Sequence, residues 1–381
     1  MRIVVAPDSY KGSLSAIEVS NAIAKGILKA FPEAEVIKVP IADGGEGTVE
    51  ALVTATGGKY IYTEVTGPLS ETINARWAIL GDGNTAVIEM AAASGLTLIA
   101  KEKRNPCITT TYGTGQLIKA ALDMGLRKFI ICIGGSATND GGAGLAQALG
   151  VKFLDSAKHE LPYGGAALIK LAEINALNLD KRLQEAKFVV ACDVANPLCG
   201  TLGASVVFGP QKGATAKMVE ELDAALENYQ KIACHTTGKD VAGIPGAGAA
   251  GGLGAGLMFF TSAKFQPGIE LVISASGLRE KIKTADLVIT GEGCTDFQTV
   301  FGKAPVGIAK LAKQFEVPVI CLAGSLGQGY REVLACDIDA LMNIQPQPMG
   351  LEQCIEEAEI LTEEAAFRLG LLLRVGIKLK I

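Results

Sequence analysis

The chain has 381 residues, of which 49% are hydrophobic and 20% charged, and its formal net charge is −5 at pH 7. Because domains usually contain about 100–200 residues, this length predicts two of them. The acidic balance excludes a nucleic-acid-binding protein with a broad basic surface. No apolar run approaches the ~20 residues that a membrane-spanning helix needs, so the apolar excess indicates buried parallel strands.

The N-terminal segment predicts alternating strands and helices. Residues 3–6 form an apolar run typical of a strand, and the polar loop after it leads to a helical pattern over about 15–31. Ser15 and Glu18, three residues apart, predict a capping box at the start of that helix. A second strand is expected over residues 35–41. This order is typical of a parallel α/β sheet.

The same alternation returns further along the chain. Strands are expected over residues 128–133, 188–191, 287–289 and 317–323, each followed by a glycine-rich loop. Residues 60–80 differ, because their pattern predicts antiparallel strands joined by turns. We therefore expect an α/β protein with parallel sheets and right-handed crossovers. One discontinuous domain is placed at 1–66 plus 266–381, and an inserted α/β domain at 67–265.

Polar residues follow several of the expected strands, in loops that also contain glycine. Ligands of open parallel sheets bind beyond the carboxyl ends of the strands, so these loops are candidate sites. Loops need polar residues in any case, and each residue alone could serve only to form a turn. The residues concerned are Asp8, Lys11, Asp43, Glu46, Asn139, Asp140, Asp193, Glu292, Asp296 and Lys303.

The loop at 134–144 has the composition of a phosphate site. Gly134 and Gly135 leave backbone amides uncovered, and Asn139 and Asp140 add oxygens suited to Mg²⁺. Asn and Asp are also common in plain turns. The Gly-x4-Gly-Lys-Ser/Thr motif of P-loop NTPases is absent from the sequence, as are the His-Arg-Asp and Asp-Phe-Gly motifs of protein kinases. The loop therefore predicts a phosphate site of another kind.

A second glycine run covers residues 246–256. Gly246, Gly248 and Gly251 match the spacing of a dinucleotide-binding fingerprint, but Pro245 precedes them where that fingerprint needs a buried strand. A nicotinamide-dependent oxidoreductase therefore has weak support. The run could instead cradle phosphate or allow close helix packing, and the sequence leaves both open.

Nine cysteines and two histidines are scattered along the chain. No two cysteines form a Cys-x-x-Cys pair, and neither His159 nor His235 lies in a motif, so a His/Cys metal site is not expected. Unpaired cysteines of this kind are typical of a reducing compartment, and a cytoplasmic protein is expected.

Seven blocks, taken in order, resemble the glycerate kinase family of bacterial sugar-acid and glyoxylate pathways. They are APDSYKGSLSA (6–16), PIADGGEGT (40–48), GGSATNDGGAG (134–144), ACDVANPL (191–198), VFGPQKGA (207–214), GAGAAGGLGAG (246–256) and TGEGCTDFQTVFGKAPVGIA (290–309). The resemblance implies a flavodoxin-like parallel-sheet domain and a second, inserted α/β domain, with the active site in the cleft between them. It also implies phosphorylation of D-glycerate to 2-phosphoglycerate, with ATP and Mg²⁺.

Phosphoryl transfer needs positioned phosphates, a base and cations, and the matched blocks supply candidates for each. We assign Lys11, Asp193 and Asp296 as catalytic, with Asp193 or Asp296 acting as base or as Mg²⁺ ligand. The expected substrate-binding residues are Asp8, Ser9, Asp43, Glu46, Gln298 and Lys303. The expected nucleotide-binding residues are Gly134, Gly135, Ser136, Asn139 and Asp140. Asp193 could instead cap a turn, and Lys11 could be solvated.

One position departs from the family pattern. The family usually carries a basic residue directly after the second glycine of Gly-Glu-Gly, where this chain has Cys294. Arginine and a thiol are not interchangeable at an anion site, so the affinity for glycerate is the property that this change would alter. The sequence leaves two alternatives open: a kinase of another small hydroxy acid, since the sequence does not place the pocket residues, and a non-catalytic ligand-binding protein whose site has decayed at Cys294. A monomer or homodimer is expected, with no nucleic-acid or membrane partner.

Overall fold

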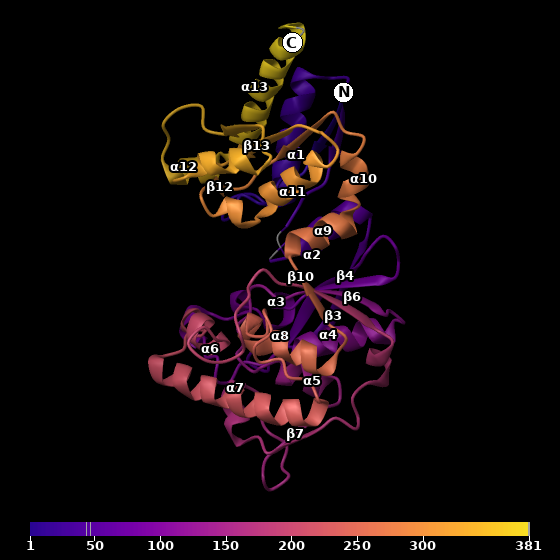
Figure 1. The fold of residues 1–381 in the computed structure, drawn as a ribbon, viewed down its shortest axis with the longest axis vertical. Coiled ribbons are helices and arrows are strands. Elements are labelled where there is room, and N and C mark those ends of the chain that lie inside the picture. Colours follow the sequence, from indigo (N-terminus) through magenta and orange to yellow (C-terminus); the bar gives the residue numbers. More distant parts are fainter. Residues whose placement is uncertain (43, 46, 380–381) are drawn as a thin grey trace. The chain divides into compact units, whose positions relative to one another are not determined.

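The computed structural model describes residues 1–42, 44–45 and 47–379. The chain divides into two compact units (Figure 1). Unit 1 comprises Met1–Asp43, Glu50–Gly57 and Ile269–Ile381, and unit 2 comprises Gly44–Val49 and Gly58–Gly268. Parallel strands form the centre of the larger sheet in each unit, which confirms the expected α/β class.

Unit 1 is built on a five-stranded sheet in the order β15-β13-β11-β1-β2, and all of its neighbouring strands are parallel. The strands are β1 (Arg2–Val5), β2 (Glu35–Lys38), β11 (Leu287–Thr290), β13 (Val319–Ala323) and β15 (Ala340–Asn343). Counted along the chain within this unit, the order is 2-1-3-4-5, which is that of flavodoxin-like sheets. A separate short pair joins β12 (Cys294–Thr295) to β14 (Ser325–Leu326).

Helices cover the sheet of unit 1. They are α1 (Ala16–Ala30), α2 (Thr48–Thr56), α9 (Gly268–Ser276), α10 (Leu278–Ile282), α11 (Ala304–Lys313), α12 (Leu351–Glu356) and α13 (Ala358–Leu379), of which α2 and α9 begin in unit 2. The expected capping box starts α1: Ser15 Oγ accepts from Glu18 N at 3.3 Å, and Ser15 N donates to the Glu18 carboxylate at 2.8 Å. Strands β11 and β13 are buried throughout, as parallel strands covered on both faces are.

The core of unit 1 lies between the sheet and the helix pair α1 and α13. Ile23 and Ile27 of α1 are buried against strand residues such as Ile289. α13 runs alongside α1 (Figure 1), and a Cβ atom at Gly26 would lie only 2.1 Å from the Glu363 carbonyl oxygen. Glycine at this position therefore lets the two helices approach closely.

Unit 2 is built on a six-stranded mixed sheet in the order β10-β9-β6-β5-β4-β3. The strands are β3 (Lys59–Thr66), β4 (Thr72–Ile79), β5 (Thr85–Glu89), β6 (Lys128–Cys132), β9 (Lys187–Ala191) and β10 (Lys264–Gln266). The strands from β5 to β10 pair in parallel, whereas β3 and β4 are antiparallel, as the pattern at 60–80 predicts. Because β3 pairs with β4 along its whole length, residues 59–66 belong to this second sheet rather than to the first domain, where the sequence analysis placed them.

The helices of unit 2 are α3 (Ala91–Ser94), α4 (Tyr112–Asp123), α5 (Ala143–Ala148), α6 (Ala204–Phe208), α7 (Ala216–Thr237) and α8 (Ala249–Phe260), and a hairpin joins β7 (Lys152–Leu154) to β8 (Glu173–Asn175). One buried cluster lies on the sheet and contains Trp77 together with Phe129 and Phe188, whose rings stack at 4.6 Å. A second cluster contains Phe153 and Tyr229. Within the described ranges, no helix is long and apolar enough to cross a membrane.

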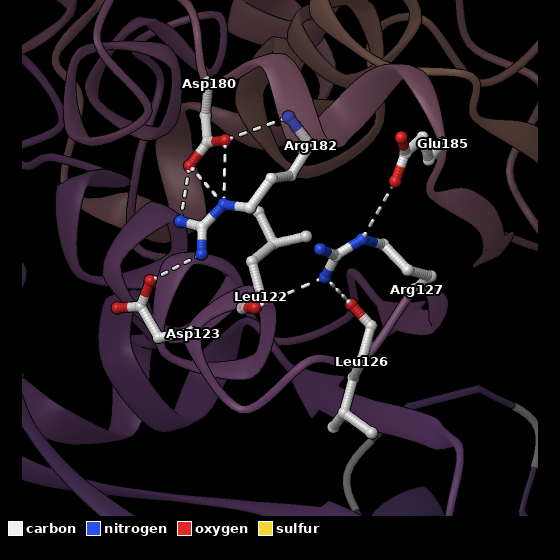
Figure 2. A network of polar contacts seen from close by, with 7 residues as sticks. All are labelled: Leu122, Asp123, Leu126, Arg127, Asp180, Arg182 and Glu185. Atoms are coloured by element: carbon white, nitrogen blue, oxygen red, sulfur yellow. Dashed lines mark hydrogen bonds and ion pairs between the residues drawn. The ribbon is translucent and has the colours of Figure 1, made fainter.

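At the amino ends of β6 and β9, two arginines form a surface network of ion pairs that links residues 123–127 to residues 180–185. Arg182 bridges Asp180 and Asp123, with 2.7 Å contacts to each, and Arg127 lies 3.6 Å from Glu185 (Figure 2). The exposed pairs, Arg182 with Asp123 and Arg127 with Glu185, contribute about 0–1 kcal/mol each. The network lies at the opposite ends of the strands from the glycine-rich loops, so we interpret it as structural.

Candidate active site

The loops that follow β1 and β11 lie side by side at the carboxyl edge of the first sheet. Asp8 N donates to Gly291 O at 2.8 Å, and a Cβ atom at Gly293 would lie 3.1 Å from Lys11 N. In a flavodoxin-like sheet these two strands flank the point where the strand order reverses, and ligands bind in the crevice there. The topology thus brings together two sequence blocks that are almost 300 residues apart.

Glu292 is a buried carboxylate in the loop after β11. One of its oxygens accepts from Thr299 Oγ1 at 2.7 Å and from Thr295 Oγ1 at 3.2 Å. Its side chain is 9% exposed, and burial raises the pKa of Glu292, opposed by the threonine hydroxyls and by Lys303. The sequence analysis named Glu292 among the strand-end residues but gave it no role.

Lys303 lies between two carboxylates. Its Nζ is 3.6 Å from Glu292 Oε2 and 3.9 Å from Asp296 Oδ1. Asp296 Oδ1 also accepts from Gln298 N at 2.8 Å, and the second Asp296 oxygen has no partner within the described residues. Lys303 occupies the N-cap position of α11, so the start of this helix fixes the position of the Lys303 backbone. The predicted residues Asp296 and Lys303 are therefore brought together with Glu292.

Other predicted residues of unit 1 border this cluster. Lys11 and Gln298 are exposed, and Asp8 and Ser9 are half-buried, with Asp8 Oδ1 accepting from Ser9 N at 2.6 Å. The thiol of Cys294 is exposed on β12. Asp43 and Glu46, two predicted substrate-binding residues, lie outside the described residues.

In unit 2, two glycine-rich loops, at residues 44–45 and 134–135, lie close together near the end of β9, at the carboxyl edge of the second sheet. A Cβ atom at Gly134 would lie 3.1 Å from Gly45 Cα, and one at Gly44 would lie 2.8 Å from Ala191 Cβ at the end of β9. Gly134 and Gly135 are exposed, and Gly135 has a φ of +73°, a conformation that favours glycine. The turn can therefore present backbone amides to an anion.

Asn139 and Asp140 point into the interior instead. The Asp140 carboxylate accepts from Thr111 N at 2.8 Å, Thr111 Oγ1 at 2.9 Å, Gly142 N at 3.1 Å and Gly144 N at 3.3 Å. Asn139 Nδ2 donates to Ser205 Oγ at 2.9 Å. Both residues are almost fully buried, and burial raises the pKa of Asp140 against these hydrogen bonds. Any contribution to nucleotide binding would act through the shape of the loop.

Asp193 follows β9 and is exposed. Its Oδ1 accepts from Gly268 N at 3.0 Å, at the first residue of α9. This contact caps the N-terminus of α9, so the capping role considered from the sequence exists, although for a helix that begins 75 residues later. Asp193 belongs to unit 2, whereas Asp296 belongs to unit 1.

The glycine run at 246–256 serves close packing. Within α8 the residues Ala250, Gly251 and Gly252 have positive φ values, and a Cβ atom at Gly251 would lie 1.9 Å from Thr138 O. One at Gly256 would lie 2.6 Å from Gly141 O. Strand β9 ends more than 50 residues earlier, so the run lacks the preceding strand that a dinucleotide fingerprint requires.

Lys212 is a buried residue that the sequence analysis missed. It is 1% exposed, and its Nζ donates to Thr138 O at 2.6 Å. Burial lowers the pKa of Lys212 to about 7, opposed by the negative charge of Asp140. The only signal in the sequence is its place in the block VFGPQKGA, between two glycines.

The carboxylates are compatible with a magnesium ion. Within the described part of the chain no group of three or more His, Cys, Asp or Glu side chains gathers, so no all-protein metal cage is present there. Mg²⁺ usually binds through one or two carboxylates together with substrate phosphates and water. The Asp296 oxygen that has no partner in the described part of the chain fits that requirement.

The sheet topology and the charged strand-end loops are typical of α/β enzymes that bind ligands at the carboxyl ends of their strands. The sequence model of the glycerate kinase family matches residues 3–374. The chain belongs to the glycerate kinase family, and it is a kinase.

Individual relatives agree with this assignment. A protein of Escherichia coli strain K12 named glycerate 2-kinase is 50% identical, over 99% of each chain. A glycerate kinase of Halalkalibacterium halodurans is 52% identical, over 96% of each chain. A crystal structure from Salmonella typhimurium LT2, of a protein assigned as glycerate kinase 2, has a TM-score of 0.90 and 48% identity over 99% of each chain.

Proposed function

We propose that the protein transfers the γ-phosphoryl group of ATP to D-glycerate and releases 2-phosphoglycerate. The observation that carries this proposal is the 50% identity, over nearly the whole of both chains, with a protein named glycerate 2-kinase. The clustering of Asp296, Lys303 and Glu292 at the reversal of the first sheet adds physical support. The cytoplasmic location and the monomeric or dimeric state stay predictions.

In this proposal the glycerate hydroxyl loses its proton to a carboxylate, either Asp193 or Asp296. The freed oxygen bonds to the γ-phosphorus while the bond between that phosphorus and the leaving oxygen of ADP breaks. Lys11 and Lys303 supply positive charge for the substrate carboxylate and the transferring group. Asp8, Ser9, Gln298, Asp43 and Glu46 would bind the substrate. A magnesium ion held by Asp193 or Asp296 would neutralise phosphate charge.

The nucleotide is assigned to the loop after β6. Gly134 and Gly135 are exposed, and their backbone amides are not screened by side chains, as phosphate binding requires. Ser136 is buried at the end of the turn. Asn139 and Asp140 would support this loop from inside through the hydrogen bonds of Asp140 to Thr111 and Gly142.

Cys294 does not favour a decayed site. It is exposed on β12, whose pairing with β14 is regular, and the neighbouring contacts of Glu292, Thr295 and Lys303 are present. A decayed site would lose several such contacts. The position can therefore alter the affinity for glycerate without removing the cations and carboxylates that we assign to the reaction.

The test measures the reaction and its product. The protein is incubated with ATP, Mg²⁺ and D-glycerate, and ADP release is followed, with L-glycerate as the control. The isolated product is then given to enolase alone. We expect phosphoenolpyruvate without added phosphoglycerate mutase, because enolase accepts the 2-phosphate. A requirement for the mutase would contradict the regiochemistry, and no glycerate-dependent ADP release would contradict the proposed substrate.

A further inference from the structure

The side chain of Lys212 lies in the interior of unit 2, where the buried Asp140 is its charged neighbour but lies beyond ion-pair distance. Its Nζ donates to Thr138 O at 2.6 Å, and no carboxylate lies within ion-pair distance of it in the described ranges. Burying an ammonium group without such a partner is costly, whereas methionine would fill a similar volume without that cost. Packing alone therefore does not account for a lysine here.

The backbone directs this side chain inward. Lys212 ends the short helix η5 (Pro210–Lys212), and Lys212 N donates to Gly209 O at 3.0 Å. Gly213 follows with a φ of +94°, and a Cβ atom there would lie 2.4 Å from Arg104 O. Gly213 thus allows a tight turn that packs against Arg104 and leaves Lys212 buried.

The carbonyl that Lys212 binds belongs to the loop after β6. Thr138 comes three residues after Gly135, so the contact lies within about 10 Å of the exposed turn along the chain. Ala137, which precedes Thr138, is also held by hydrogen bonds. Its carbonyl oxygen accepts from Thr109 Oγ1 at 2.9 Å, and its N–H donates to Ser94 O at 3.0 Å. Among the groups that form these hydrogen bonds to Ala137 and Thr138, Lys212 Nζ is the one that can carry a positive charge.

We propose that Lys212 is a positioning residue for the nucleotide. Through Thr138 O it holds the loop in the shape in which Gly134 and Gly135 present their amides to phosphate, and when protonated it places a positive charge beneath that loop. This inference rests on the proposed nucleotide site. Lys212 is buried and acts through the loop, so it is not assigned to the reacting atoms.

The test measures ATP binding directly, by titration calorimetry on the full-length protein with Mg²⁺ and without glycerate. For Lys212→Met we expect the Kd for ATP to rise by ~10-fold or more, the scale of a lost charge-assisted contact. The KM for D-glycerate should stay within ~2-fold, because that substrate is assigned to other residues. Thermal unfolding is followed in parallel.

Lys239→Met is the matched control. Lys239 Nζ also donates to backbone carbonyls, those of Met258, Phe259 and Thr261 at 2.8–3.2 Å, at the end of α8. This variant should lower the Tm and leave the Kd for ATP unchanged. Lys212→Gln is the second variant, since it removes the charge and keeps an N–H donor, and it replaces Lys212→Met if the latter fails to fold.

The outcomes separate the inference from the function on which it rests. Wild-type protein that does not bind ATP would overturn the proposed function. Wild-type protein that binds ATP, with Lys212→Met binding equally well, would overturn only the role of Lys212. Failure of both Lys212 variants to fold would make the residue structural and would also overturn the inference.

Discussion

Asp193 has a structural contact that would persist without any ligand. Its Oδ1 accepts from Gly268 N at the start of α9, and the side-chain oxygen of asparagine can accept the same bond. We therefore expect Asp193→Asn to leave the Tm nearly unchanged. Turnover should fall by ~10²-fold or more, because asparagine can neither accept the hydroxyl proton nor supply a negative charge to Mg²⁺. Steady-state kinetics and thermal unfolding, measured in parallel, check both statements.

Lys11→Ala allows the same comparison, of turnover with stability, for a residue of unit 1. Lys11 is exposed, so its removal should cost little stability. We expect turnover to fall by ~10²-fold because a cation meeting the transferring charge is lost. If either variant keeps more than about a tenth of wild-type turnover, that residue is not catalytic. Loss of the Asp193 role would leave Asp296, whose second oxygen has no partner among the described residues, as the better candidate for the base.

The buried amine of Lys212 predicts a pH-dependent stability. Burial lowers its pKa to about 7, so the unfolded chain binds a proton that the folded chain does not between about pH 7 and the ordinary lysine pKa. The cost of charging this group in the folded state is absent at high pH and grows as the pH falls toward 7. Lys212→Met removes that cost, while its lost hydrogen bond to Thr138 O is a constant penalty.

The Tm difference, Lys212→Met minus wild type, should therefore be more positive at pH 6 than at pH 9 by a few degrees. Differential scanning calorimetry at several pH values measures it. A constant difference across this range would show that the amine does not titrate in the folded protein near neutral pH, contrary to its depressed pKa.

At the scale of elements, helix α8 shapes the loop that it supports. Gly251 has a φ of +69°, and a Cβ atom there would lie 1.9 Å from Thr138 O and 2.7 Å from Asn139 Cα. Gly251→Ala should destabilise the fold by more than the roughly 1–2 kcal/mol of a left-handed alanine, because the backbone at 138–139 must also move. The Kd for ATP should rise, since the same loop carries the nucleotide turn.

Gly238 supplies the control for this prediction. It ends α7 with a φ of +72°, and a Cβ atom there would meet nothing within 4 Å. Gly238→Ala therefore carries the backbone strain without the clash, and we expect about 1–2 kcal/mol of destabilisation with normal ATP binding. Equal effects of the two variants in denaturant unfolding and ATP titration would refute the close-packing account of the glycine run.

The elements themselves were largely predictable. The helix start at Ser15, the strands that carry the candidate loops and the antiparallel pair at 60–80 all follow from local patterns of apolar and capping residues. The boundary expected at 66 lies at Gly58 in the structure, because β3 pairs with β4 and β4 pairs with β5, so that both strands belong to the second sheet.

At the scale of the whole molecule, the two units have separate hydrophobic cores. Ile27 is buried in unit 1, whereas Ile88 and Trp77, the single tryptophan of the chain, are buried in unit 2. Ile27→Ala should cost about 2–5 kcal/mol of stability in unit 1, as a buried cavity does. In a denaturant titration it should shift the far-ultraviolet circular dichroism and leave the tryptophan fluorescence midpoint nearly unchanged.

Ile88→Ala is the reciprocal variant. It should shift the fluorescence midpoint, because the cavity lies in the cluster that contains Trp77. If Ile27→Ala moves both signals by the same amount, the chain unfolds as one cooperative body and the two cores do not act separately.

The sequence by itself determined the α/β class, most of the elements and, through seven ordered motif blocks, the family. It also grouped the strand-end loops that carry Asp8, Lys11, Asp296 and Lys303, because periodicity, capping and the carboxyl-edge rule are local or topological. It left open whether a polar loop residue faces a ligand or the interior. The tertiary structure decided this for Asn139, Asp140 and Lys212, and for the glycines of 246–256, because burial depends on which distant segments pack around each side chain.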